Sequence, residues 1–179
     1  KTAGALVVFV ALLGAAYYFV TRPDKGERTG ERPRPVPALS ADQIKRLKLT
    51  AKGETVVLER RGADRWQVVD PLTYPADSSA VKSAVDKITE LEFGDLVTEL
   101  KSKHAKLGVD ADQGIRVEVS DGDKLLAAFV VGKVIDSFTM LRPADRDQVY
   151  QAVGSLSYAF DRELKNWRDR TIVSFTQDK

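Results

Sequence analysis

The stretch Ile115-Arg-Val-Glu-Val-Ser-Asp-Gly-Asp-Lys-Leu-Leu-Ala-Ala-Phe-Val-Val131 decides the fold class. Apolar and polar residues alternate over 115–119, as they do in a strand with one buried face. Asp121-Gly122 is a strong hairpin-turn sequence, and the apolar run over 125–131 is the return strand. An antiparallel hairpin is therefore the first element of the predicted fold.

Further strands are predicted over residues 54–59, 66–69, 96–99, 138–142 and 148–153. A helix begins at Asp77 or Ser78 as N-cap, and a second helix is predicted from Val153 to Trp167, with its apolar residues on one face. Gly108 is expected to stop a helical turn over 102–107, and Gly132 to end a strand. Residues 41–108 and 109–179 thus form two similar halves, each a strand meander followed by a helix. We predict an α+β fold with mostly antiparallel sheets.

The N-terminal residues predict a membrane anchor and a tether. Residues 2–20 carry no charge and would span about 28 Å as a helix, so 1–21 is predicted to be a single transmembrane helix. Gly4, Ala11 and Ala15 share one face of this helix and could pack on another membrane helix, although small residues are common in such helices anyway. Residues 22–40 are rich in proline and charge, which predicts an extended tether.

Composition excludes several classes of site. The chain has 179 residues, no cysteine and one histidine, so disulfides, zinc–thiolate sites and multi-histidine metal sites are excluded. The net charge of +2 comes from the N-terminal arm, and the balanced body argues against nucleic-acid binding. No nucleophile elbow, phosphate-binding loop or dinucleotide fingerprint is present. We expect no cofactor, no metal and no enzymatic activity.

Few side chains suggest a site. His104 lies among three lysines and is predicted to lie on a solvated helix face, which could also touch anionic lipid or an acidic partner. Trp66 and Trp167 are expected to be core or edge-packing residues, with ligand stacking as the alternative. The residues that could dock on a partner are Arg32, Arg34, Arg142, Trp167 and Arg168. A structural arginine–aspartate link or helix-end contacts would equally explain Arg142 and Arg168.

An ordered set of short motifs extends over residues 40–175. It comprises a Val-Val-Leu-Glu strand, Trp66, Pro71, Tyr74-Pro75-Ala76-Asp77, Leu107-Gly108-Val109-Asp110, Val131-Gly132, Leu141-Arg142, Val149-Tyr150 and Trp167-Arg168-Asp169. This order resembles a bacterial domain-of-unknown-function family of membrane-anchored proteins. The resemblance implies an N-terminal helix, an α+β extracytoplasmic body, and genes that accompany ABC-type transporters and gliding-motility-type auxiliary components. It implies no reaction and no catalytic residue.

These observations predict a non-enzymatic, single-pass accessory subunit whose body docks on or scaffolds an integral-membrane complex, in a transporter-associated context. We expect membrane lipid and that complex as partners, at the inner (cytoplasmic) membrane with the body periplasmic. The positive-inside rule alone would place the body in the cytoplasm, but a short tail ahead of a single span usually stays inside. The alternatives are a subunit of an energy-converting or pigment-binding complex, a glycan- or lipid-binding module, and an extracytoplasmic hydrolase.

Overall fold

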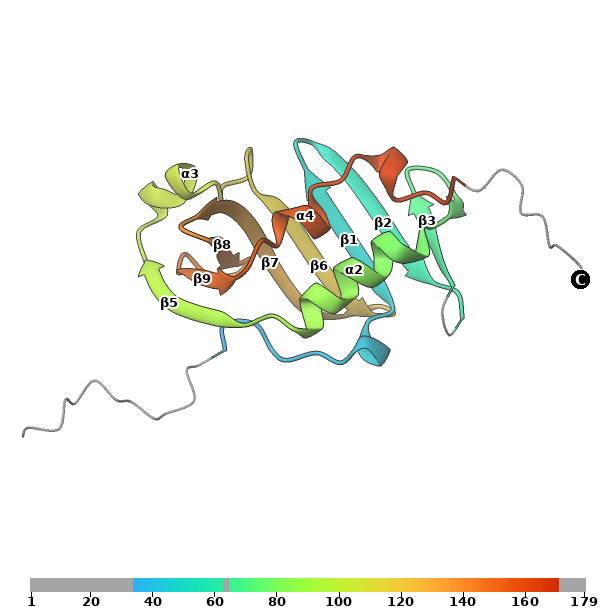
Figure 1. Cartoon of the computed structure of the whole chain (residues 1–179), viewed down its shortest axis with the longest axis horizontal. Coiled ribbons are helices and arrows are strands. Elements are labelled where there is room, and N and C mark those ends of the chain that lie inside the picture. The colour runs from blue at the N-terminus through green and yellow to red at the C-terminus, as the bar shows by residue number, and fades with distance from the viewer. Residues whose placement is uncertain (1–33, 63–64, 171–179) are drawn as a thin grey trace, which may run out of the picture. The chain divides into compact units, whose positions relative to one another are not determined.

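The computed structural model describes residues 34–62 and 65–170 (Figure 1). In chain order the elements, with η for a 3-10 helix, are η1 (Ala41–Gln43), β1 (Arg46–Ala51), β2 (Glu54–Arg60), β3 (Trp66–Asp70), β4 (Tyr74–Pro75), α2 (Ser78–Thr89), β5 (Phe93–Thr98), η2 (Lys101–Lys103), α3 (His104–Leu107), β6 (Ile115–Asp121), β7 (Lys124–Ile135), β8 (Phe138–Pro143), β9 (Val149–Val153), α4 (Ser157–Phe160) and η3 (Leu164–Asn166).

The strands form one nine-stranded sheet in the order β4-β3-β2-β1-β6-β7-β8-β9-β5. Every neighbouring pair is antiparallel. The predicted β6–β7 hairpin is confirmed, with Gly122 at a positive φ of 62° in its turn. Gly132 does not end β7, which continues to Ile135 through an irregularity in its pairing with β8.

The predicted α+β class is wrong, because the described residues are mainly one antiparallel sheet with few and short helices. Strands of the two predicted halves belong to the same sheet. Strand β1 pairs with β6 at the centre of the sheet, and β5 joins β9 at its far end. The transmembrane helix predicted for residues 1–21 lies outside the described residues. Within those residues, no helix is long and apolar enough to cross a membrane.

One face of the sheet holds the main hydrophobic core. Alternate residues of the central strands, such as Leu47, Val117 and Phe129, are fully buried on this face. Figure 1 shows α2 and α4 lying across the strands on the same side. The predicted N-cap of α2 is confirmed, since the Asp77 side chain accepts a hydrogen bond from the backbone N of Ala80 at 2.9 Å.

A smaller cluster lies on the opposite face of β7, β8 and β9. Val130 and Met140 are adjacent in sequence to Val131 and Leu141, which belong to the main core, so they point the other way. Leu107, the last residue of α3, and Val109 also belong to this second cluster. The η2–α3 segment is therefore attached to the face opposite α2.

The long helix predicted from Val153 to Trp167 is wrong. Only α4 is helical there, followed by the 3-10 turn η3. The buried Thr139 hydroxyl donates to Gly154 O at 2.6 Å and accepts from Leu156 N at 3.0 Å, which fixes the chain in a non-helical path ahead of α4. Leu156 and Trp167 are nevertheless buried, as the apolar spacing suggested.

The last residues of the predicted tether pack against the sheet. Val36 is only 4% exposed and belongs to the main core cluster, while Arg34 and Pro37 are exposed. The described part of the 22–40 segment is thus part of the folded body.

Candidate functional site

A surface groove of about 1080 Å³ lies on the α3 side of the sheet. Its walls are the segment through η2 and α3, the turn before β6, and the β8–β9 loop. Its lining residues are Glu99, Lys101, Ser102, His104, Ala105, Asp110, Ala111, Arg142, Ala144, Asp145, Arg146, Asp147 and Gln148.

Two glycines let α3 approach the sheet closely. Gly108 ends α3 at a φ of +68°, which confirms the predicted stop and is a conformation that favours glycine. A Cβ on Gly132 would lie 2.6 Å from the carbonyl oxygen of Leu107 and from a Val109 methyl. Gly132 therefore serves close packing within β7, where the sequence predicted a strand end.

His104 points into the protein, contrary to the prediction of a solvated face. It is 5% exposed, and its Nε2 lies 2.8 Å from the carbonyl oxygen of Asp147 in the β8–β9 loop. Because a carbonyl oxygen only accepts hydrogen bonds, Nε2 carries a proton and donates it. The flanking lysines obscured this role, but the spacing of His104 and Leu107 on one helical face could have indicated it.

Arg142 braces the same loop from the sheet. Its Nε donates to Val109 O at 3.1 Å, and its Nη1 donates to Pro143 O at 3.3 Å and to Arg146 O at 2.9 Å. Burial lowers the pKa of the Arg142 guanidinium, and the nearby Arg116 acts in the same direction, while Asp147 opposes them. Three donated hydrogen bonds to main-chain oxygens thus hold Arg142 in place.

The groove is charged and lacks large apolar side chains. Carboxylates of four residues and the cations of three line it, and alanines are its apolar members. Such a lining suits a polar protein surface better than an apolar small molecule. In the described part of the chain, no group of three or more potential ligand residues is placed to hold a metal ion.

The predicted docking residues do not converge. Trp167 is fully buried, which confirms its predicted core role and removes it from the surface. The Arg168 guanidinium lies 4.8 Å from the centre of the Tyr74 ring, a cation–π contact within the fold. Of the four docking candidates that the structure describes, Arg142 alone lines the groove. The remaining candidates Arg32, Gly4, Ala11 and Ala15 lie outside the described residues.

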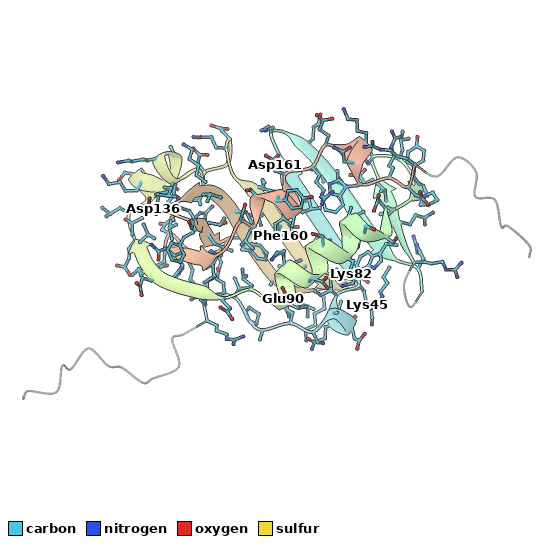
Figure 2. The ribbon with its side chains drawn as sticks, viewed as in Figure 1. Lys45, Lys82, Glu90, Asp136, Phe160 and Asp161 are labelled. Atoms are coloured by element: carbon cyan, nitrogen blue, oxygen red, sulfur yellow. The ribbon has the colours of Figure 1, made fainter. Side chains whose placement is uncertain are left out.

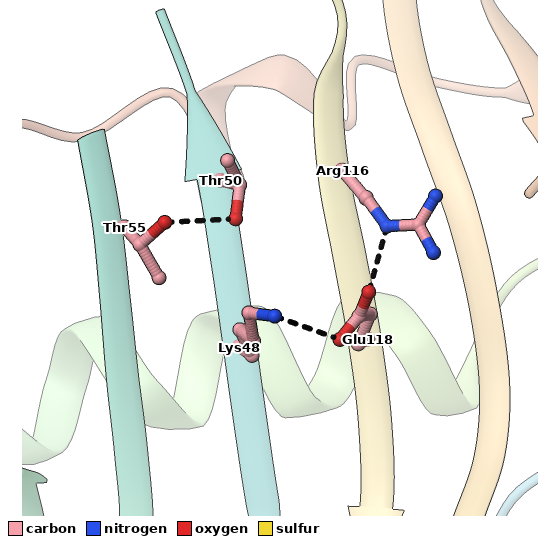
Figure 3. A network of polar contacts seen from close by, with 5 residues as sticks. All are labelled: Lys48, Thr50, Thr55, Arg116 and Glu118. Carbon is pink, nitrogen blue, oxygen red and sulfur yellow. Dashed lines mark hydrogen bonds and ion pairs between the residues drawn. The ribbon is translucent and has the colours of Figure 1, made fainter. Parts of the chain in front are cut away.

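A second polar surface lies on β2, β1 and β6, on the face opposite α2 (Figure 3). Lys48 and Arg116 both approach the carboxylate of Glu118, at 3.4 Å and 2.7 Å. The hydrogen bond from Arg116 holds the pKa of Glu118 below its usual value, and the charge of Lys48 adds to the effect. Glu118 pairs with both cations, so these three side chains find their partners within the fold.

Residues 66–179 match the family described as "Domain of unknown function (DUF4340)". This match covers more than half of the chain, and the chain therefore belongs to that family. The predicted resemblance to a domain-of-unknown-function family is confirmed at this level. No curated protein and no solved structure matches the chain.

Proposed function

We propose that the chain is a non-enzymatic accessory subunit of a membrane complex and that the groove beside α3 binds a partner protein. The observation that supports this is the braced β8–β9 loop. His104 and Arg142 both use donors to hold its backbone, so the groove is pre-formed, and pre-formed sites lose little entropy on binding. Arg142, which lines the groove, then acts as the docking residue for a partner carboxylate.

The membrane context rests on the uncharged segment 2–20, and the transporter association rests on the sequence resemblance. The proposal places the body on the periplasmic side of the cytoplasmic membrane, where an integral-membrane complex is within reach. A subunit of an energy-converting or pigment-binding complex would use the same groove. The identity of the captured partner distinguishes the two contexts.

Site-specific photocrosslinking in native membranes tests this proposal. A photoreactive amino acid at Ala111, an exposed residue of the groove wall, should capture one membrane protein that also co-purifies in fixed ratio. The matched control is the exposed Ala41 in η1, which lies outside the groove and should not capture it.

Charge-reversal variants provide a second test of the groove, with the same photocrosslinking readout. Arg146→Glu in the groove should reduce capture at least about tenfold, whereas Arg65→Glu, at an exposed position away from the groove, should leave it unchanged. Equal capture at Ala111 and Ala41, or equal effects of the two reversals, would reject the groove as the binding site.

A further inference from the structure

Two glutamates on one face of the sheet are each shared by two cations. This face, here called the outer face, is formed by β1, β2, β6 and the start of β7 and lies opposite α2 (Figure 3). One glutamate is Glu118, with the contacts given above. The other is Glu59, whose carboxylate lies 2.9 Å from the Arg61 guanidinium and 3.7 Å from that of Arg46. Each carboxylate offsets one of its two cations, so each group of three keeps one positive charge.

The cations of both groups are more exposed than the carboxylates. The side chains of Glu118 and Glu59 are 21% and 26% exposed, whereas those of their four cations are between 42% and 56% exposed. The carboxylates therefore lie beneath the cations and hold them in position, while the cationic groups face outward. Cations positioned in this way favour a ligand of opposite charge.

Other charges at the outer face leave this excess in place. Asp70 of β3 is exposed and lies opposite Val57, which places it on the same face. Lys45 and Asp121, at the ends of β1 and β6, pair with each other at 2.6 Å. Within the described residues of β1, β2, β3 and β6, the outer face and the adjoining Arg61 thus combine three carboxylates with the cations Arg46, Lys48, Arg61 and Arg116.

An exposed leucine lies among these cations. Leu125 of β7 is opposite Ser120 of β6, which is opposite Arg46 of β1, so the three side chains share the outer face. Leu125 is 56% exposed. Cations beside an exposed apolar side chain are typical of surfaces at a membrane interface, where the cations meet headgroups and the apolar group enters the boundary with the acyl chains.

The chain enters the folded body beside the same face. Pro35 and Val36 line one surface pocket together with Arg116 and Leu125. Under the proposed function, residues 2–20 are a membrane anchor, and residues 21–33 could span at most about 45 Å. A body attached in this way stays close to the bilayer, and its chain arrives at the edge of the outer face.

We propose that the outer face binds a bilayer with anionic headgroups, with its cations at the headgroups and Leu125 in the interface. The inference rests on the membrane context of the proposed function. A protein partner fits less well, because β1, β2 and β6 contain no aromatic residue and the face lacks the apolar centre of a protein interface. The groove beside α3 lies on the same side of the sheet, so it would face a partner in the same membrane.

Short-range fluorescence quenching in vesicles tests this contact, because the chain has no cysteine of its own. The full chain with a single labelled Ser120→Cys is reconstituted in phosphatidylcholine vesicles, with or without phosphatidylglycerol, that carry a nitroxide on some headgroups. Quenching should require phosphatidylglycerol and decrease at high salt. The matched control is labelled Ser79→Cys, at an exposed position of α2, which should not be quenched.

Paired substitutions test the role of the cations. Replacing both Arg46 and Lys48 with Gln leaves each carboxylate one cation, Arg61 or Arg116, so the fold should be retained. The ratio of docked to undocked bodies should fall about tenfold or more. The control replaces both Lys82 and Lys87 with Gln on α2, the helix in front of the sheet in Figure 2, and should leave the ratio unchanged although the net charge falls equally.

A substitution without charge change separates insertion at the interface from electrostatic attraction alone. Leu125→Ser should lower quenching at Ser120→Cys about threefold, because the apolar group no longer enters the interface. Tyr158→Ser, at a residue of α4 that is 77% exposed, should leave quenching unchanged. Circular dichroism of each variant checks that the fold is retained.

Equal quenching with and without phosphatidylglycerol, equal quenching at the two labels, or equal effects of the two paired substitutions would overturn the proposal. A label at Ser120→Cys that is shielded in native membranes but not quenched in the vesicles would assign the face to an acidic protein and also overturn it. The vesicles contain no other protein, so failed capture at Ala111 leaves this result unaffected. A chain that does not float with pure phosphatidylcholine vesicles contradicts the anchor, while quenching that depends on phosphatidylglycerol still tests the face.

Discussion

Val36→Ala tests whether the end of the proline-rich segment belongs to the folded body. Val36 is 4% exposed and packs in the main core cluster, although it lies between Pro35 and Pro37 in a stretch that the sequence predicted to be a tether. Because this side chain packs in the core, shortening it should destabilise the whole sheet.

The size of the effect follows from the groups removed. The substitution deletes two buried methyl groups, each contributing about 0.8 kcal/mol to burial. The small cavity left behind adds to this loss, because the surroundings relax only in part. We therefore expect the free energy of unfolding to fall by about 1.5–2.5 kcal/mol.

Urea unfolding of the full chain, followed by tryptophan fluorescence, measures this change. Trp167 is in the core and Trp66 packs against it, so both report on the sheet. The midpoint should fall while the slope stays constant, because the unfolded surface is almost unchanged. Val153→Ala makes the same chemical change at a residue that is 52% exposed, and it should cost below about 0.5 kcal/mol.

The reasoning is refuted if Val36→Ala changes stability no more than Val153→Ala does. That result would mean that residues 34–39 detach from the body without cost, and that the predicted tether extends to residue 40 as the sequence suggested.

Three further substitutions probe single contacts. Asp77→Ala removes the N-cap of α2 and should cost about 1 kcal/mol in urea unfolding, with the helix otherwise unchanged by circular dichroism. Gly132→Ala should cost about 1–3 kcal/mol in the same assay, because its Cβ would lie 2.6 Å from the carbonyl oxygen of Leu107; a stability equal to wild type would contradict the close approach of α3. Glu118→Gln should cost about 0.5 kcal/mol at pH 7. Since the Arg116 hydrogen bond lowers the pKa of Glu118 in the folded state, this difference should be present above the unfolded value of 4.5 and disappear as the pH falls through the lower folded value, as unfolding curves at pH 7 and pH 3 would show.

Local patterns predicted the elements whose partners are close in sequence. The β6–β7 hairpin follows from alternation and the Asp121-Gly122 turn, and α2 follows from its cap and apolar stripe. These elements satisfy their hydrogen bonds within a few residues, so a short window of sequence contains the information that forms them.

Non-local pairing was not accessible in this way. The helix predicted from Val153 to Trp167 had suitable apolar spacing, but the Thr139 hydroxyl, from another strand, fixes residues 154–156 in a different path. The strand pairing between the two predicted halves was missed for the same reason. The strands of the β1–β6 and β5–β9 pairs are far apart in the sequence. The residues of one strand do not identify the strand with which it pairs.

The candidate groove was predicted only in part. Arg142 was named as a docking residue, and the groove includes it. The structural role of His104 was missed, because three neighbouring lysines suggested solvent exposure, while its acceptor is a backbone oxygen 43 residues away. Every residue has a backbone carbonyl oxygen, so residue types alone do not indicate which of these oxygens accepts the hydrogen bond.

The family match and the sheet together define the unit that folds. The match begins at Trp66, the first residue of β3, and omits β1 and β2. Yet β1 lies between β2 and β6 in the middle of the sheet, and Leu47 and Leu58 are fully buried there. Without these strands, β3 and β6 would each lose a neighbour and the core would lose one side. The folded body is therefore larger than the matched region, which is why the groove must be tested in the full chain.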